Sequence, residues 1–204
     1  MNDPVTRPPV VRGRPPKDVN APRGREQVVA ATIEAAAELF SERGIATVSV
    51  REVASHAGVN PALVHRYVGG KTELVRAAID HLVEDMRGYL RTAASSPLPA
   101  LPGAPEQTMA TYQRIVAHIV IEGGDIREYQ SEFPVIHHVI DEIERRSGVD
   151  PRTARMRAAQ LFALDLAVRL FEPVLVRAAG LEPDDTEDLH QRVRELLMAL
   201  AEEP

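Results

Sequence analysis

The sequence of 204 residues contains no cysteine. This absence excludes a disulfide framework, a thiolate metal site and a cysteine nucleophile, and nothing in the chain indicates an oxidising compartment. No apolar run approaches the roughly 18 to 20 residues needed to span a bilayer. The N-terminus is rich in proline and arginine, where a signal peptide would be apolar. We therefore predict a cytoplasmic protein without a membrane partner.

The sequence also lacks the motifs of common enzyme classes. It has no glycine-rich phosphate loop, no nucleophile elbow and no His-Glu-x-x-His run. Most of its carboxylates lie on the polar faces of predicted helices. These absences argue against an enzyme, and we expect no cofactor and no catalytic residue.

Charge is distributed unevenly along the chain. Residues 1–91 carry 13 Lys and Arg against 11 Asp and Glu, whereas residues 92–204 carry 11 against 19, so their formal net charges are +2 and −8. The first 25 residues hold six basic groups against two acidic ones. A polyanionic partner would therefore meet the N-terminal end, although a solvated basic tail gives the same pattern.

Proline content and helical periodicity divide the chain into three parts. Residues 1–24 contain six prolines and are expected to form a flexible basic arm. Residues 25–72 are predicted to form a three-helix domain. Residues 73–204 are predicted to form a larger helical domain, with a loop over the Pro-rich residues 92–105. The predicted fold class is all-α, with about nine helices and no convincing strand.

Two short helices joined by a tight turn are predicted within the first domain. Ser49 is an N-cap, and Glu52 follows it at the spacing of a capping box. Gly58 ends this helix, and Asn60 caps the next one, with Pro61 at its first position. This arrangement is that of a helix-turn-helix.

The C-terminal part has four further periodic segments, at about 106–122, 126–147, 152–178 and 186–202. Pro134 and Pro173 are expected to bend or break the helices that contain them. The last two helices carry apolar stripes that need cover, and they can pack on a second copy of the chain as a four-helix interface. The candidate dimerisation residues are Leu161, Leu164, Val168, Phe171, Leu175, Leu189, Val193, Leu196 and Leu200. Core helices of a monomer show the same pattern.

A recognition helix needs short or polar side chains at its N-terminal end, where it enters the major groove, and nearby groups that hold phosphates. Asn60 can bond a base edge or a phosphate, and Arg66 can fork to guanine or a phosphate. The candidate DNA-binding residues of the two short helices and their surroundings are Ser49, Arg51, Asn60, Pro61, Ala62, His65, Arg66, Tyr67 and Lys71. Taken singly, Ser49 and Asn60 can also be only caps, and Arg66 only a surface charge.

The segment RGIATVSVREVASHAGVNPALVHRYVGGKTELVRAAI resembles the DNA-binding region of the TetR family of bacterial regulators. The resemblance covers about residues 25–80 and rests on Phe40, Gly44, Val53-Ala54, Ala57-Gly58-Val59, Tyr67 and Lys71. The sequence departs from the family pattern at Val48, His65 and Gly69, so the resemblance supports Tyr67 as a phosphate ligand more strongly than it supports His65. The resemblance implies an all-α homodimer that binds DNA through its second and third helices. It also implies a C-terminal effector pocket and a dimer interface formed by the last two long helices.

The basic arm contains a further motif. Arg12-Gly13-Arg14-Pro15 is the core of an AT-hook, in which extended arginines lie along a narrow A·T minor groove. Beside a helix-turn-helix, Arg12 and Arg14 are candidate minor-groove contacts. Non-specific attraction to phosphates and an inert tail remain as alternatives.

Histidines suggest two further hypotheses. His118 and Glu122 are four residues apart, as are two other His and acidic pairs on a predicted helix, His137-Asp141 and His138-Glu142. Such a pair can form half of a metal site, but no third ligand is identifiable, so we favour ordinary surface or core histidines and predict no metal. A pocket for an apolar ligand is hypothesised from Phe133, His137, Met156 and Phe162.

Together these patterns predict a transcriptional regulator that binds a palindromic double-stranded DNA operator as a homodimer. We expect it to act as a repressor that leaves the operator when an unknown small molecule binds the C-terminal domain. The alternative is a ligand-independent DNA-binding or protein-interaction module. A C-terminal region that stays closed and binds nothing would favour this alternative.

Overall fold

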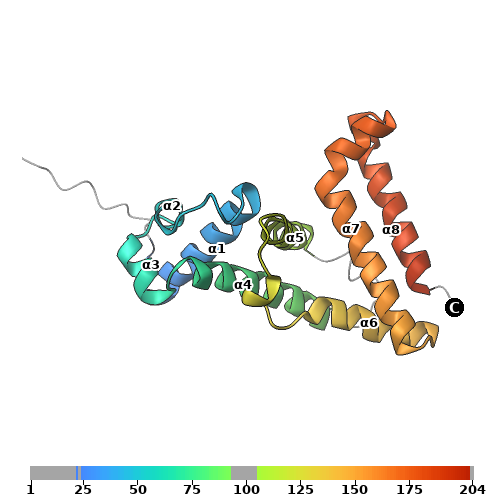
Figure 1. The fold of residues 1–204 in the computed structure, drawn as a ribbon, viewed down its shortest axis with the longest axis horizontal. Helices are drawn as coiled ribbons and strands as arrows, with labels where there is room; N and C mark the ends of the chain where they lie inside the picture. The colour runs from blue at the N-terminus through green and yellow to red at the C-terminus, as the bar shows by residue number, and fades with distance from the viewer. Residues whose placement is uncertain (1–21, 23, 93–104, 203–204) are drawn as a thin grey trace, which may run out of the picture.

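The structure is a computed structural model that describes residues 22, 24–92 and 105–202. Within these residues it contains eight α-helices, two short 3-10 helices and no strand (Figure 1). The predicted all-α class is confirmed, with one α-helix fewer than the expected number over the described ranges. Most of the predicted arm lies outside the described residues.

The first three helices form a small bundle at one end of the molecule (Figure 1). They are α1 (Arg25–Arg43), α2 (Val50–His56) and α3 (Pro61–Tyr67). α1 contacts both α2 and α3, and α2 contacts α3. The α2–α3 pair contributes three fully buried side chains to this packing, Val53, Ala54 and Val64. Their burial fixes the angle between the two short helices.

The long helix α4 (Lys71–Thr92) connects this bundle to the rest of the chain and contacts α1, α5 and α6. Its inner face is apolar, and Leu74 and Ile79 are fully buried. One hydrophobic cluster runs from Phe40 in α1 through this face to Leu161 in α7. The predicted border between residues 72 and 73 therefore lies in the first turn of α4, within a shared core.

The C-terminal helices are α5 (Glu106–Ile121), α6 (Pro134–Ser147), α7 (Pro151–Ala179) and α8 (Thr186–Glu202). α5 lies against α1 and α4, whereas α6 joins α4 to α7 and α8. α7 and α8 form an antiparallel pair at the end opposite α2 and α3, and their connection projects to the top of the view (Figure 1). This connection contains the 3-10 helix η2 (Pro183–Asp185).

The expected helix over residues 126–147 is wrong before Pro134. The 3-10 helix η1 (Ile126–Glu128) occupies the beginning of this segment, and α6 starts only at Pro134. Proline has no N–H to continue a preceding helix but fits the first helical position, so Pro134 marks a break and a new start. Pro173 behaves differently, because α7 continues through it to Ala179.

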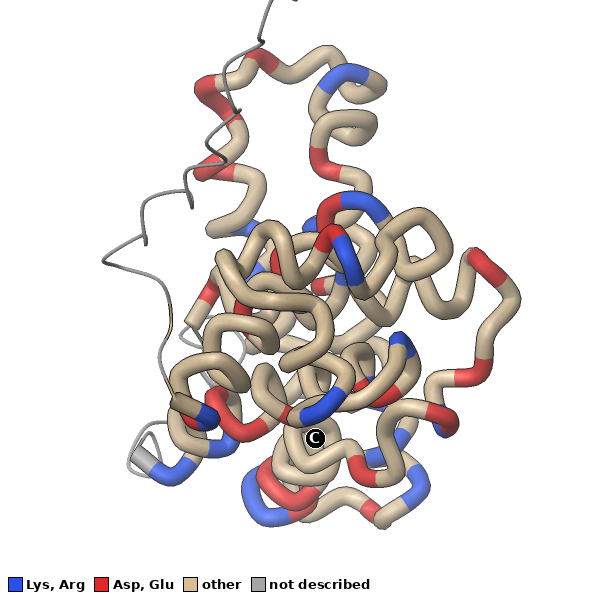
Figure 2. The backbone as a smooth tube through the Cα atoms, turned by 90° about the vertical axis from the view of Figure 1, so that its left-hand side faces the viewer, with Lys and Arg blue, Asp and Glu red and all other residues tan. Residues whose placement is uncertain are grey.

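Basic and acidic positions are scattered along the backbone in this view, and both signs also occur on the helices that project behind the α2–α3 end (Figure 2). Basic positions are therefore not gathered into one continuous stretch of the described backbone. None of the described helices combines the length and apolarity that a bilayer crossing requires.

Candidate DNA-binding face and ligand cavity

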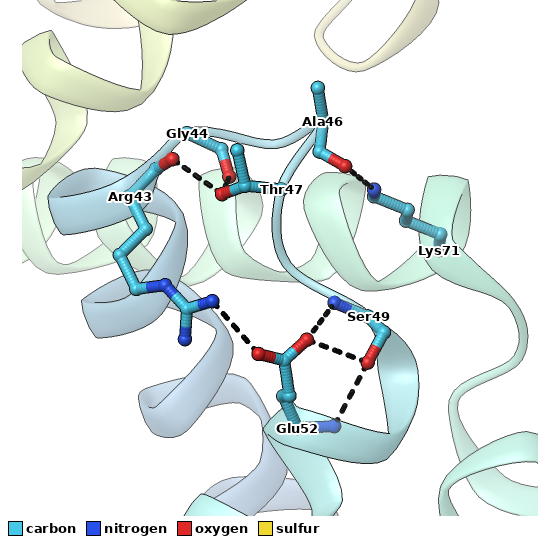
Figure 3. A network of polar contacts seen from close by, with 7 residues as sticks. All are labelled: Arg43, Gly44, Ala46, Thr47, Ser49, Glu52 and Lys71. Carbon is cyan, nitrogen blue, oxygen red and sulfur yellow. Dashed lines mark hydrogen bonds and ion pairs between the residues drawn. The ribbon is translucent and has the colours of Figure 1, made fainter.

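The start of α2 is held by a closed set of hydrogen bonds (Figure 3). The Ser49 hydroxyl accepts from the Glu52 N–H at 3.2 Å and donates to Glu52 Oε2 at 2.8 Å. The same carboxylate accepts from the Ser49 N–H at 2.9 Å, and its second oxygen accepts from Arg43 at 2.8 Å. The Ser49 backbone N–H is the main cause that lowers the pKa of Glu52 to about 2. The Ser49 hydroxyl is thus committed to the cap, and DNA contact by Ser49 stays a prediction.

The start of α3 is capped by Asn60, whose Oδ1 accepts from the Ala62 N–H at 2.9 Å. Pro61 occupies the first helical position. The cap uses only the carbonyl of the Asn60 side chain, so its exposed amide group keeps two donors for a base edge or a phosphate. Asn60 and Pro61, from which the start of this helix was predicted, therefore occupy the predicted cap and first helical position.

A group of side chains from α2, α3 and the start of α4 lies at this end of the molecule, and we call it the DNA-binding face: Arg51, Asn60, Ala62, His65, Arg66, Tyr67 and Lys71. Arg51, Ala62, His65 and Arg66 are exposed, whereas Tyr67 and Lys71 are half-buried. The Arg66 guanidinium lies 5.6 Å from the centre of the Tyr67 ring, a cation–π distance that keeps the arginine close to α3. The structure thus brings the candidates from residues 51 to 71 together. Arg12 and Arg14 lie outside the described residues.

Lys71 is held by the turn between α1 and α2. Its Nζ donates to the backbone carbonyl of Ala46 at 3.1 Å (Figure 3). An ammonium group has three donors, so two remain for phosphate oxygens. This contact was not foreseen, because no local sequence signal joins residues 25 positions apart.

A second site is a cavity of about 210 Å³ between α4, α5, α6 and α7. Its wall is mainly apolar, with Val83, Met86, Met109, Val116, Phe133, Val135, Ile136, Phe162 and Leu166 among the lining residues. The polar lining consists of three uncharged side chains, Tyr112, Gln113 and Gln130. Such a wall suits an apolar molecule with few polar groups.

The polar groups of the cavity are mostly engaged by protein partners. The Tyr112 hydroxyl donates to Gln130 Oε1 at 2.9 Å, and burial raises the pKa of Tyr112. Gln113 Nε2 donates to the buried carboxylate of Asp165 at 2.6 Å, and Arg169 Nε donates to both oxygens of that carboxylate at 3.1 Å. Gln113 Oε1 is buried and accepts no hydrogen bond from the described residues.

Two of the four predicted pocket residues line this cavity, namely Phe133 and Phe162. His137 and Met156 are exposed and lie outside its wall. On α6 the buried positions are Val135 and Val139, and His137 stands about 200° around the helix axis from Val135. The wall contributed by α4 and α5 was missed, although the apolar spacing of Val83 and Met86 indicated an inward face.

The predicted dimerisation residues divide into two groups in the single chain. Leu161, Val168 and Val193 are buried, and three others are half-buried, Leu164, Leu189 and Leu200. Phe171 is 54% exposed, Leu175 is 40% exposed and Leu196 is 60% exposed. α7 and α8 therefore use one apolar stripe against each other and leave a second one uncovered.

The histidine pairs do not form a metal site within the described residues, where no group of three suitable ligands lies together. His118 Nδ1 lies 4.0 Å from Glu122 Oε1. Glu122 instead accepts a hydrogen bond from the backbone N–H of Ala46 at 3.0 Å.

The capped α2–α3 pair, with its exposed polar face and buried inner face, is a helix-turn-helix of a DNA-binding protein. A sequence profile for bacterial regulatory proteins of the tetR family matches residues 33–78. The HTH-type transcriptional repressor Rv3405c of Mycobacterium tuberculosis is 32% identical to this chain over 181 residues, which are 89% of this chain and 93% of that protein. The HTH-type transcriptional regulator BetI of Brucella suis is 35% identical over 89 residues, or 44% of this chain and 39% of that protein.

Solved structures show the same fold at lower identity. Mycobacterium smegmatis BioQ matches with a TM-score of 0.53 and 19% identity, over 88% of this chain and 98% of that chain. The multidrug binding protein EbrR, solved with imidazole, matches with a TM-score of 0.51 and 21% identity, over 84% and 88% of the two chains. The chain belongs to the tetR family of bacterial regulatory proteins, and it is a DNA-binding transcriptional regulator.

Proposed function

We propose that this regulator binds a palindromic double-stranded operator as a homodimer and represses transcription until an apolar small molecule enters the cavity. The observation that carries the proposal is the composition of α3. Its outer side presents a small residue, Ala62, followed one turn later by His65 and Arg66, all exposed. A small side chain lets the backbone approach the groove, and Arg66 supplies the bidentate donor that reads guanine or grips a phosphate.

The uncovered apolar stripe of α7 and α8 supports the homodimer. Phe171, Val174 and Leu175 of α7 are exposed, as is Leu196 of α8. Large apolar side chains in one strip favour burial, and a second copy offers the same strip in a two-fold arrangement. Two recognition helices are then available for successive major grooves, roughly 34 to 36 Å apart.

Substitution within this strip tests the dimer. Phe171→Asp is expected to give monomers in analytical ultracentrifugation, because the new charge would have to be buried without a partner. The matched control is Val120→Asp on α5, since Val120 is also exposed (61%) but lies outside α7 and α8. If both variants sediment like the unsubstituted protein, the dimer uses another surface.

The cavity supports regulation by a ligand. A ligand can release DNA only through a difference in affinity between the DNA-bound and free conformations, and the cavity wall combines residues from four helices that link the two ends of the molecule. The remaining alternative is a ligand-independent module with an empty cavity. It would be favoured if a library of neutral apolar compounds failed to raise the unfolding temperature at saturating concentration.

Arg12 and Arg14 are proposed to contact the minor groove beside the operator core. Extended arginines suit a narrow, electronegative A·T groove, and the arm precedes α1 directly. Deletion of residues 1–20 is expected to reduce both the operator affinity and its salt dependence. An unchanged affinity and salt slope would refute the contact.

The experiment for the proposed function is a mobility shift of the purified full chain with its own promoter region, across a salt series. We expect a discrete complex that survives competition by unrelated DNA, with an affinity that falls as salt rises. Binding that competitor DNA abolishes equally, or no complex at all, would contradict a specific operator.

A further inference from the structure

The structure points to a connection between the ligand cavity and the DNA-binding face. We infer that Glu122, at the end of α5, is a positioning residue for DNA binding, because it holds the peptide that orients Lys71. This inference rests on the proposed function and adds to it the route by which a change in α5 reaches the DNA.

The connection consists of two hydrogen bonds on one residue, Ala46, in the turn between α1 and α2. The Ala46 N–H donates to Glu122 Oε2 at 3.0 Å, and the Ala46 carbonyl accepts from Lys71 Nζ at 3.1 Å. Glu122 and Lys71 lie 76 and 25 positions away from Ala46. One short turn therefore joins the end of α5 to the start of α4.

Gly44 shows how close α5 comes to this turn. A Cβ at residue 44 would lie 2.6 Å from Glu122 Oε1 and 2.9 Å from His118 Nδ1, which is inside contact distance. The backbone there has φ 81° and ψ 157°, a conformation that glycine alone adopts readily. The absence of a side chain at Gly44 permits the Glu122 carboxylate to reach the backbone.

The same helix forms a wall of the cavity. Met109, Tyr112, Gln113 and Val116 are lining residues on α5, and the carboxylate that holds Ala46 lies less than two turns beyond Val116. A helix moves as a unit over so short a distance, so a shift of α5 at the cavity is transmitted to Ala46. The Lys71 ammonium, which has two donors left for phosphate, moves with that peptide.

The test compares Glu122→Ala with Glu122→Gln in the full chain. Both variants remove the same negative charge, so any relief of repulsion from DNA is equal. Only glutamine keeps an oxygen that accepts from the Ala46 N–H. We expect Glu122→Ala to bind the promoter fragment about fivefold more weakly than Glu122→Gln, with similar unfolding temperatures. Equal affinities for the two variants would overturn the inference.

A double-mutant cycle with Lys71→Ala separates positioning from general stability. In the Lys71→Ala background the difference between Glu122→Ala and Glu122→Gln is expected to disappear, because the side chain that Glu122 positions is gone. If the difference persists there, Glu122 acts by another route and the inference fails.

Hydrogen exchange supplies a readout without DNA. The Ala46 amide is expected to exchange faster in Glu122→Ala than in Glu122→Gln and the unsubstituted protein, because its acceptor is lost. Equal exchange in all three proteins would show that the contact does not form. If the unsubstituted protein binds no DNA while exchange follows this order, the proposed function fails and the contact stands.

Discussion

The two ends of this regulator differ in how directly the sequence encodes them. The α2–α3 pair is defined by local signals, namely caps, a glycine and a proline between Ser49 and Pro61. The cavity and the α7–α8 pair depend on how helices distant in sequence pack together. Local rules therefore specify the helix-turn-helix, whereas tertiary packing specifies the cavity and the arrangement of α7 and α8.

Substitution of Phe40 is expected to have the largest effect on stability, because Phe40 belongs to the core that both ends of the molecule share. It is fully buried in α1, and Phe40→Ala is expected to lower the free energy of unfolding by about 3 to 5 kcal/mol. Urea unfolding at fixed protein concentration should show one transition, whether it is followed by a spectroscopic probe at the α2–α3 end or by one at the α7–α8 end. Two separate transitions would break the picture of a single shared core. Val120→Ala, at an exposed site, serves as the control.

Gly44 and Gly58 form a matched pair that sharpens the comparison. Both have positive φ, but an added Cβ meets Glu122 and His118 only at Gly44, and nothing within 4 Å at Gly58. Alanine at Gly58 carries a backbone cost of about 1 to 2 kcal/mol, whereas Gly44→Ala combines the higher backbone cost of φ 81° and ψ 157° with the clash against α5. Thermal unfolding should therefore show the lower midpoint for Gly44→Ala. Equal midpoints would indicate that α5 does not press on this turn.

Removal of the capping box of α2 is expected to lower the stability by less than the two substitutions above. Ser49→Ala is expected to lower the free energy of unfolding by about 1 kcal/mol, through the lost cap. The pKa of Glu52 is about 2 in the folded chain and 4.5 ordinarily, so this carboxylate stabilises the fold fully above about pH 4.5 and loses that effect as pH falls toward 2. The difference in unfolding temperature between the unsubstituted protein and Glu52→Gln should shrink only below that pH. A difference that already shrinks near neutral pH would contradict the cap.

The smallest expected effect on stability comes from a substitution in the cavity wall, whose main consequence is a change in ligand binding. An uncharged apolar fluorophore, N-phenyl-1-naphthylamine, is expected to bind the unsubstituted protein with enhanced emission. Val116→Trp fills part of the cavity and should weaken this binding, whereas Met156→Trp should not, because Met156 lies outside the wall. Equal loss in both variants would place the probe elsewhere.

The sequence predicted the helix-turn-helix well because its determinants are neighbours in the chain. The capping bonds of Ser49, Glu52 and Asn60 join residues two or three positions apart, so pattern and structure coincide there. His137 and Met156 show the opposite case, since their side of the helix is set by packing against distant elements. Helix boundaries also depend on packing that the sequence pattern does not show. Pro134 starts α6, whereas Pro173 lies inside α7.

The connection through Ala46 was beyond the reach of sequence patterns for the same reason. His118 and Glu122 have the spacing of a metal half-site, but in the structure Glu122 accepts from the backbone N–H of Ala46, in the turn between α1 and α2. Spacing along one helix identifies which side chains share a face, and it carries no information on what that face meets.

The central claim is that the exposed side of α3 reads DNA, and Arg66 tests it most directly. Fluorescence anisotropy with a promoter fragment would compare Arg66→Ala with Arg155→Ala, which removes the same charge from an exposed site on α7. We predict that Arg66→Ala weakens specific binding by about tenfold or more, while Arg155→Ala leaves it nearly unchanged. Equal affinities for the two variants would contradict recognition by α3.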